Sequence, residues 1–461
     1  MAQNAVSNDD SDIGYIPSRK QMWADLSRLS WPCAVELLLS STIGIITMAM
    51  VSNLGKEAVS AVGITNQPIM IPNVLLQAFC VGGTALVARS LGQGNNDQAR
   101  RSCEQTLLLS LFFSVIFGVI MYFFGSLFLL WMGATPDYFP LAELYMRYCA
   151  IGVLFQSIST AVSAMLRGAG LTKLSMRFNI ISNLVNVVAG FVLINGFLFF
   201  PALGLLGAAI AQLIAKIVGC IVALWILFSS HELAICPNVH AIIHPDFSII
   251  SRICRVGTSS ALEQLALRIG LIMFTVYIIN LGTAEYAAHN ISNTIHSYVV
   301  NFGQAIGIAL VSFVGQNLGS NRPDIAERYF KEAILMSLLI GATLMLPLWV
   351  FSPQIASIFT NEADVAENII ITLRILTFFI AGQIVQMAIC GGLRGGGDTK
   401  WPLISTVVGV LGMRMVIGYL LIVIMNLGLV GAWMSWLLDQ NIRAVIIYLR
   451  FRGGKWKKIV V

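Results

Sequence analysis

The sequence predicts an all-α integral membrane protein, with twelve transmembrane helices in two pseudo-symmetric six-helix lobes. Hydrophobic residues make up 57% of the 461 residues and charged residues only 11%, whereas a soluble domain carries roughly 25% charged residues. The charges lie between apolar stretches of roughly 20 residues, the length of a membrane-spanning helix. The pattern of the first half also recurs in the second half at a constant spacing.

The recurrence is clearest at a short glycine-rich turn. Arg167-Gly168-Ala169-Gly170 in the first half matches Arg394-Gly395-Gly396-Gly397 in the second, at a spacing of 227 residues. At this spacing, without a gap, further polar positions also match: Glu36 with Glu263, Asn66 with Asn293, and Gln156 with Gln383. Each half has an even number of spans, so both enter the membrane from the same side. Parallel repeats of this kind place their binding site between the halves, near mid-membrane.

Apolar runs and charge define the order of the segments. The expected spans cover about residues 30–52, 68–89, 105–130, 145–166, 178–198, 204–228, 256–280, 295–316, 332–353, 367–389, 402–424 and 428–448. Lys and Arg gather at both termini and in the even-numbered connections, which the positive-inside rule places in the cytoplasm. The segments are therefore a cytoplasmic N-terminal stretch 1–29, a first lobe 30–228, a linker 229–255, a second lobe 256–448 and a basic cytoplasmic tail 449–461.

The linker contains three histidines, His231, His240 and His244. A solvated connection between the lobes is the main interpretation. A metal-binding cluster is the alternative, although no carboxylate or cysteine spacing accompanies the histidines. The eight cysteines show no spacing typical of disulfides or metal sites.

Two acidic residues inside the spans are the main candidates for function. Charge in hydrocarbon is costly, so an intramembrane carboxylate is a functional candidate. Glu36 lies four residues after Pro32, and Glu263 holds the equivalent place in the second half. Either is expected to exchange a proton through a pKa raised by burial, or to be fixed structurally by Ser, Asn or a basic partner.

Other intramembrane polar groups are candidates for a cavity between the lobes. Asp439 and Arg443 are spaced to pair along one helical face, and Arg268 is expected to pair with another helix or to face a polar cavity. The amides either link helices or contact substrate; they are Asn66, Gln156, Asn293 and Gln383. The remaining cations are expected to extend toward the interface or to pair; they are Lys216, Arg374 and Arg414.

The sequence also argues against several classes of function. The glycine-rich turns lack the preceding strand and the Lys-Ser/Thr ending of a phosphate-binding loop. No nucleophile–base–acid set is evident, so we expect no enzyme and no cofactor. The net charge of +6 comes from loops on one side of the membrane and does not indicate nucleic acid.

The motifs resemble those of the multidrug and toxic compound extrusion (MATE) family. The resemblance covers both halves, from about residue 25 to 455. The matching stretches are the Pro-x-x-x-Glu start of the first span, Met50-Val51-Ser52-Asn53-Leu54-Gly55, Leu91-Gly92-Gln93-Gly94, Gly315-Gln316-Asn317-Leu318-Gly319, Leu393 to Lys400, and Gly428 to Ala432.

The resemblance implies two lobes around a V-shaped cleft and a cation-coupled antiporter that exports amphipathic, often cationic, organic compounds. Many members carry a coupling Asp in the first span where this chain has Thr47. Acidic positions of the sodium-coupled branch correspond to Leu267 and Gln386. Glu36, with Glu263, therefore becomes the expected coupling residue, and the ion is H⁺ or Na⁺.

The sequence thus predicts a monomeric transporter of small organic compounds in the inner membrane, with lipid as its surroundings. The alternative is a lipid or lipid-linked oligosaccharide flippase of the same broad fold. The glycine-rich turns are expected to be structural, about half a membrane thickness from the chemistry at Glu36 and Glu263.

Overall fold

The computed structural model describes residues 16–196, 201–229, 235–238 and 244–459. Within them the backbone forms only helices and their connections. The first half contains α1 (Arg19–Ser52), α2 (Lys56–Gly92), α3 (Asn96–Trp131), α4 (Phe139–Gly168), α5 (Thr172–Asn195) and α6 (Gly204–Ser229). The second half contains α8 (Phe247–Ile279), α9 (Thr283–Gly319), α10 (Pro323–Val350), α11 (Ser352–Phe359), α12 (Ala363–Gly395), α13 (Lys400–Thr406), the π-helices η3 (Val407–Ile417) and η4 (Leu420–Ile424), α14 (Gly428–Arg452) and the 3₁₀ turn η5 (Lys455–Lys458).

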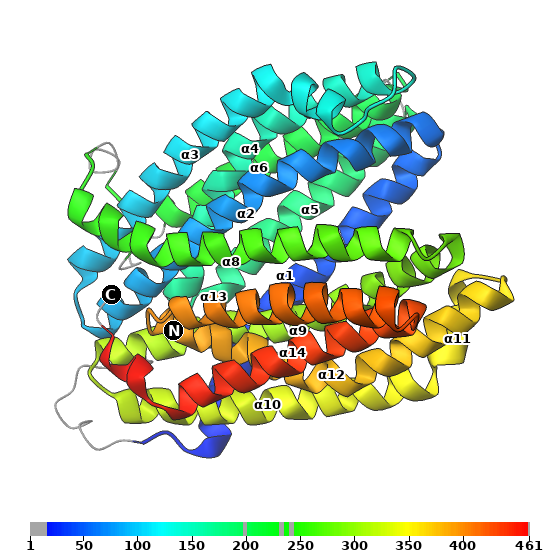
Figure 1. Cartoon of the computed structure of the whole chain (residues 1–461). Helices are drawn as coiled ribbons and strands as arrows, with labels where there is room; N and C mark the ends of the chain where they lie inside the picture. The colour runs from blue at the N-terminus through cyan, green and yellow to red at the C-terminus, as the bar shows by residue number, and fades with distance from the viewer. Residues whose placement is uncertain (1–15, 197–200, 230–234, 239–243, 460–461) are drawn as a thin grey trace.

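The two halves form two bundles of long, roughly aligned helices. Helices α2–α6 occupy the upper part of Figure 1 and α9–α14 the lower part, with α8 between them. Eleven segments of the described chain are long and apolar enough to cross a membrane. Helix α14 is the twelfth long helix; it has 25 residues, and its buried Asp439, Gln440 and Arg443 lower its hydropathy. The predicted twelve-helix fold is confirmed.

Several helices begin earlier than the apolar runs indicate. Helix α2 begins at Lys56 and α9 at Thr283, so the expected starts near 68 and 295 were wrong. The preceding residues are the equivalent glycines Gly55 and Gly282, whose φ angles of 107° and 147° suit a residue without a Cβ. Polar residues interrupt the apolar run after these turns, but they do not interrupt the helical hydrogen bonding.

The inter-lobe connection is partly helical. Helix α8 begins at Phe247, inside the range expected for the linker, because the Asp246 carboxylate accepts hydrogen bonds from the Ser248 and Ile249 amides. Such a side chain satisfies amides that have no partner in the first helical turn. Two of the linker histidines, His231 and His240, lie outside the described residues.

Helix α1 lies between the lobes. Its first turns contact the second lobe through α10: Trp23 Nε1 donates to Glu332 at 2.5 Å, and Tyr329 donates to Asp25 at 2.8 Å. Farther along, Ser41 accepts a hydrogen bond from Asn301 of α9 at 3.0 Å. The same helix packs against α5 of the first lobe, so Glu36 lies on a helix that contacts both lobes.

The lobes meet at the end of the bundle where α1 begins and α14 ends, here called the terminal end (Figure 1). There the last turns of α2 and α9 approach closely. Gly92 faces the backbone of Gln316, and its equivalent Gly319 faces the backbone of Arg89. A Cβ at either glycine would overlap backbone atoms of the other helix. This contact between α2 and α9, the terminal seam, joins the two lobes without an intervening side chain.

Candidate functional site

Glu36 lies at the centre of a buried polar cluster that connects three helices. Only 7% of the residue is exposed. Its carboxylate accepts hydrogen bonds from Arg167 at 2.6 Å, Ser175 at 3.0 Å and Asn179 at 3.0 Å. Ser163 accepts hydrogen bonds from both Ser175 and Asn179. These contacts tie α1 to α4 and α5 within the first lobe.

Glu263 forms the equivalent cluster in the second lobe, with only 2% of its surface exposed. Arg394 Nη2 lies 2.8 Å from both oxygens of this carboxylate. Thr406, at the position equivalent to Asn179, donates at 3.5 Å. The glutamate and arginine are 131 residues apart in both lobes, so the internal repeat extends to the ion pair itself.

The two ion pairs overturn one expectation. The glycine-rich turns were expected to lie far from the glutamates, but each turn's arginine binds its lobe's glutamate directly. Arg167 and Arg394 are the residues that begin the turns, at the ends of α4 and α12. The arginine side chain is long enough to extend back along its own helix and reach a carboxylate on a neighbouring helix. The positions of these residues in the sequence do not reveal this contact.

The Arg167 turn also forms part of the terminal seam. Ser312 of α9 donates a hydrogen bond to the carbonyl oxygen of Arg167. Gln316 donates to the carbonyl of Gly168 at 3.2 Å. The residue that binds Glu36 through its side chain therefore contacts the opposite lobe through its backbone, and this connects the first-lobe cluster to the terminal seam.

A second polar network lies deeper in the second lobe. Arg443 donates to Thr406 at 2.9 Å, which links it to the Glu263 cluster. Asp439 is fully buried and forms an ion pair with Arg414 of η3. The predicted pairing of Asp439 with Arg443 is wrong: in the described residues each binds a different partner, because neighbouring helices offer closer groups than the next turn of α14.

Aromatic rings surround this second network. The Arg414 guanidinium lies over Trp436, 4.6 Å from the ring centroid. His296 bonds Gln383 at 2.8 Å and meets Trp436 edge-on at 4.7 Å. His289 packs between Phe274 and Trp433. From the sequence, Arg414 was expected to extend toward the membrane interface or to form a pair, and no function was assigned to this residue. His289 and His296 were not identified, although an ionisable residue within an apolar span is a signal that could have found them.

The other sequence candidates do not join these clusters. Asn66 and Asn293 are exposed on α2 and α9. Gln156 contacts Thr160 of its own helix at 3.4 Å. Arg268 is half-buried on α8, and no carboxylate of the described residues lies within 4 Å of it. Gln383 is the one amide of the four that is buried, at His296.

The described residues do not form a metal site. No group of three or more histidine, cysteine, aspartate or glutamate side chains is arranged to hold a metal ion in that part of the chain. The carboxylates instead face arginine, amide and hydroxyl donors. This arrangement holds the helices of each lobe together through buried ion pairs and hydrogen bonds.

The MatE family model matches residues 32–192 and 259–420. The chain belongs to the MatE family. The two matched regions begin and end at similar places in the two lobes, in agreement with the internal repeat. Members of this family are transporters rather than enzymes, and the chain is a multi-pass membrane protein.

Relatives of similar length are named as probable multidrug resistance proteins. The chain is 26% identical to the probable multidrug resistance protein NorM of Thermotoga maritima over 449 residues, covering 97% of this chain and 96% of the relative. It is 25% identical to the probable multidrug resistance protein YoeA of Bacillus subtilis, covering 96% of each.

Solved structures share the fold of MatE-family transporters. A crystal structure of MATE in the bent conformation superposes with a TM-score of 0.87 at 24% identity, covering 95% of this chain and 97% of that one. A transporter from Pyrococcus furiosus, in which a reverse polarity of the binding pocket suggests a different function, superposes with a TM-score of 0.88 at 23% identity, covering 96% of this chain and 98% of that one. The shared fold therefore does not determine the substrate.

Proposed function

We propose that the protein is an inner-membrane antiporter, active as a monomer, that exports amphipathic and often cationic organic compounds in exchange for H⁺. The relatives named for multidrug resistance support the class of substrate. The alternating basic connections support an orientation with both termini in the cytoplasm. The observation that carries the proposal is the pair of equivalent buried Glu–Arg ion pairs, each joining the first helix of a lobe to its fourth long helix.

In the proposed mechanism, a proton competes with Arg167 for Glu36. A buried ion pair is held only while both charges are present, because an unpaired buried charge is costly. Protonation of Glu36 removes the attraction for Arg167 and releases α1 from α4 and α5. Since the Arg167 backbone accepts a hydrogen bond from Ser312 of the other lobe, movement of this turn is transmitted to the terminal seam.

The surroundings of Glu36 favour H⁺ over Na⁺. A sodium ion requires several oxygen ligands, as other hard cations do. Arg167 and Asn179 instead present N–H groups to the carboxylate, at 2.6 and 3.0 Å. These donors would repel a metal cation, whereas a proton needs only the carboxylate oxygen.

The proposal is tested by transport in proteoliposomes, with a pH gradient and a sodium gradient imposed separately. Glu36→Gln should abolish efflux driven by the pH gradient while the protein remains folded. Glu143→Gln is the matched control, since Glu143 also pairs with an arginine, at 2.8 Å, but in a half-exposed i,i+4 pair. Normal coupled efflux from the Glu36 variant would exclude this residue from the mechanism, and efflux driven only by sodium would exclude the proton.

The alternative function is transfer of lipid or lipid-linked sugar. A flippase for such anionic substrates is expected to present unpaired cations in its central cavity. Arg167, Arg394 and Arg414 are each paired with a buried carboxylate, whereas Arg443 binds Thr406 and Arg268 has no carboxylate within 4 Å among the described residues. The preference for organic cations therefore rests on the relatives named for multidrug resistance. The same liposomes should therefore export a cationic dye and leave a fluorescent anionic lipid in its original leaflet.

A further inference from the structure

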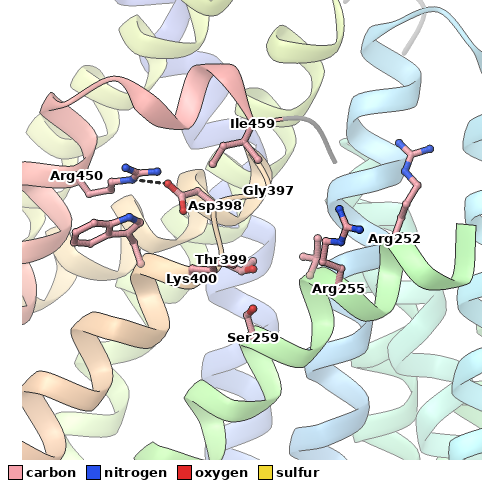
Figure 2. A pocket seen from close by; sticks show the side chains of 11 residues that line it. Arg252, Arg255, Ser259, Gly397, Asp398, Thr399, Lys400, Arg450 and Ile459 are labelled. Carbon is pink, nitrogen blue, oxygen red and sulfur yellow. Dashed lines mark hydrogen bonds and ion pairs between the residues drawn. The ribbon is translucent and has the colours of Figure 1, made fainter.

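A basic pocket lies at the terminal end, apart from both glutamate clusters. It has a volume of about 330 Å³. Its charged lining comes from three helices and one turn: Arg252 and Arg255 of α8, Lys400 of α13, Arg450 of α14 and Asp398 of the turn between α12 and α13. Figure 2 shows the α8 arginines across the pocket from the turn and Arg450.

The charges of this pocket are unbalanced. In the described part of the lining, Asp398 is the only carboxylate, and it is bound by Arg450 at 2.6 Å. Among the described residues, no carboxylate lies within 4 Å of Arg255 or Lys400, and both are exposed. Arg255 and Lys400 therefore contribute two positive charges to the lining with no carboxylate partner among the described residues. Like charges held together in a concave site repel one another, and a bound anion removes this cost.

We propose that this pocket binds a phosphate group, carried by an anionic lipid headgroup or by a soluble phosphate. Phosphate oxygens accept several charge-assisted hydrogen bonds, and arginine and lysine are their usual partners. The hydroxyls of Ser259 and Thr399 also line the pocket and add neutral donors. Basic pockets between helices at the membrane surface are typical sites for phosphate-bearing headgroups.

The position of the pocket fits a headgroup. Helix α8 begins, α13 begins and α14 ends within a few residues of its lining, so the pocket lies at the level where helices leave the hydrocarbon. Trp401 lines it and stacks on Arg450, with the guanidinium 5.1 Å from the ring centroid. Tryptophan is enriched at this level of a membrane.

Occupancy of the pocket would connect both lobes. Ile459 lines the pocket, and its carbonyl accepts a hydrogen bond from Arg89 of α2 at 2.8 Å. Arg89 is also the residue whose backbone faces Gly319 in the terminal seam. A phosphate held by α8, α13 and α14 would therefore stabilise the chain segment to which the first lobe is bonded, and with it the closed seam.

The test uses the full-length protein and two probes. In detergent, binding of radiolabelled inorganic phosphate is measured against chloride at equal ionic strength. In nanodiscs, the thermal unfolding temperature is compared between phosphatidylglycerol and phosphatidylcholine. Arg255→Gln with Lys400→Gln should weaken binding roughly 25-fold, about fivefold for each cation lost near the membrane surface. Both residues are exposed, so the variant is expected to fold.

The matched control is Arg452→Gln with Lys455→Gln. It removes the same charge from exposed residues at the same end of the molecule, outside the pocket lining, and should leave binding unchanged. Binding of inorganic phosphate without stabilisation by phosphatidylglycerol assigns a soluble ligand. A higher unfolding temperature in phosphatidylglycerol without phosphate binding assigns a lipid. Equal losses in both double variants, displacement by chloride, or no effect of either probe on the wild type would overturn the proposal.

Discussion

The two buried glutamates occupy equivalent positions but are held differently. Glu36 receives one contact from Arg167 and two from neutral donors, Ser175 and Asn179. Both oxygens of Glu263 face Arg394, and its neutral donor, Thr406, lies farther away at 3.5 Å. Neutral donors can reorient to satisfy a protonated carboxyl, whereas a guanidinium cannot accept a hydrogen bond. The first-lobe glutamate is therefore the better suited of the two to exchange a proton.

At the scale of residues, the sequence predicted which acidic residues are buried better than it predicted which residues contact them. The internal repeat identified Glu36 and Glu263 as buried equivalents, and the cost of charge in hydrocarbon marked Asp439. Their partners depend on how helices face one another, and this is not encoded in local spacing. A signal for the Glu–Arg pairs existed, because the acid and base keep the same separation in both halves.

The phosphate pocket should bind more tightly at low pH. Burial raises the pKa of Asp398, and Arg450 opposes this shift only in part. As the pH falls through this raised pKa, the carboxyl is neutralised and the pocket gains one positive charge. A unit charge about 4 Å away contributes roughly 1 kcal/mol in water, or about fivefold in affinity.

This pH dependence is measured with nanodiscs of phosphatidylglycerol, whose phosphodiester does not titrate near neutral pH. Asp398→Asn should show the low-pH affinity of the wild type at every pH, because an amide is uncharged throughout this range. Among the described residues, the pocket lining contains no histidine, and its other charged groups are Arg252, Arg255, Lys400 and Arg450, which keep their protons in this range. A wild-type affinity that does not vary with pH would show that Asp398 stays ionised.

At the scale of elements, the π-helical segment is the least regular part of the second lobe. Helix η3 contains 11 residues, Val407–Ile417, with Arg414 in its last turn. Long π-helical stretches are rare, and shorter ones are frequent at functional sites. Hydrophobic periodicity predicted a span from about 402 to 424 but could not predict its wider turns. The π-helical segment contains Arg414, which forms the ion pair with Asp439.

Gly409 of η3 provides a test of this packing. A Cβ at Gly409 would meet Asp439 Oδ1 and lie 2.5 Å from Arg443 Cγ. Gly409→Ala should therefore lower the thermal unfolding temperature, since overpacking costs about 1–3 kcal/mol. Gly412→Ala, in the same segment, is the control, because nothing lies within 4 Å of its added Cβ. If both variants unfold at the same temperature, the network does not depend on close packing at Gly409.

At the scale of the whole molecule, the repeat predicted two lobes but not how they meet. Two helices of the same length and pattern, α2 and α9, form the terminal seam through the equivalent glycines Gly92 and Gly319. An antiporter of the proposed kind exposes its binding site to one side of the membrane at a time, so it must form this contact and also break it. Under that proposal one sequence encodes both arrangements, and periodicity and charge cannot indicate which end is closed in a given state.

Transport should therefore stop when the terminal seam is locked. Gly315 of α9 faces the side chain of Ala88 of α2, and a Cβ at Gly315 would lie 2.7 Å from the Ala88 Cβ. This is closer than the roughly 3.5–4.5 Å between the Cβ atoms of a disulfide. Cysteines at these two positions, in a protein lacking its native cysteines, should therefore form a disulfide across the lobes after a small outward shift of the two helices. In the proposed orientation, with both termini in the cytoplasm, substrate enters at this end and the lobes separate there. Oxidation is therefore expected to abolish efflux, and a reductant should restore it.

The control for this experiment is a disulfide within one lobe. Gly341 of α10 faces Ala381 of α12 just as closely, and both helices belong to the second lobe. Cysteines at this pair should cross-link without loss of efflux if each lobe moves as a rigid body. Full efflux from the oxidised Ala88–Gly315 pair would mean that the seam never opens. Loss of efflux from the Gly341–Ala381 pair would instead place the movement within the second lobe, where η3 and its ion pair lie.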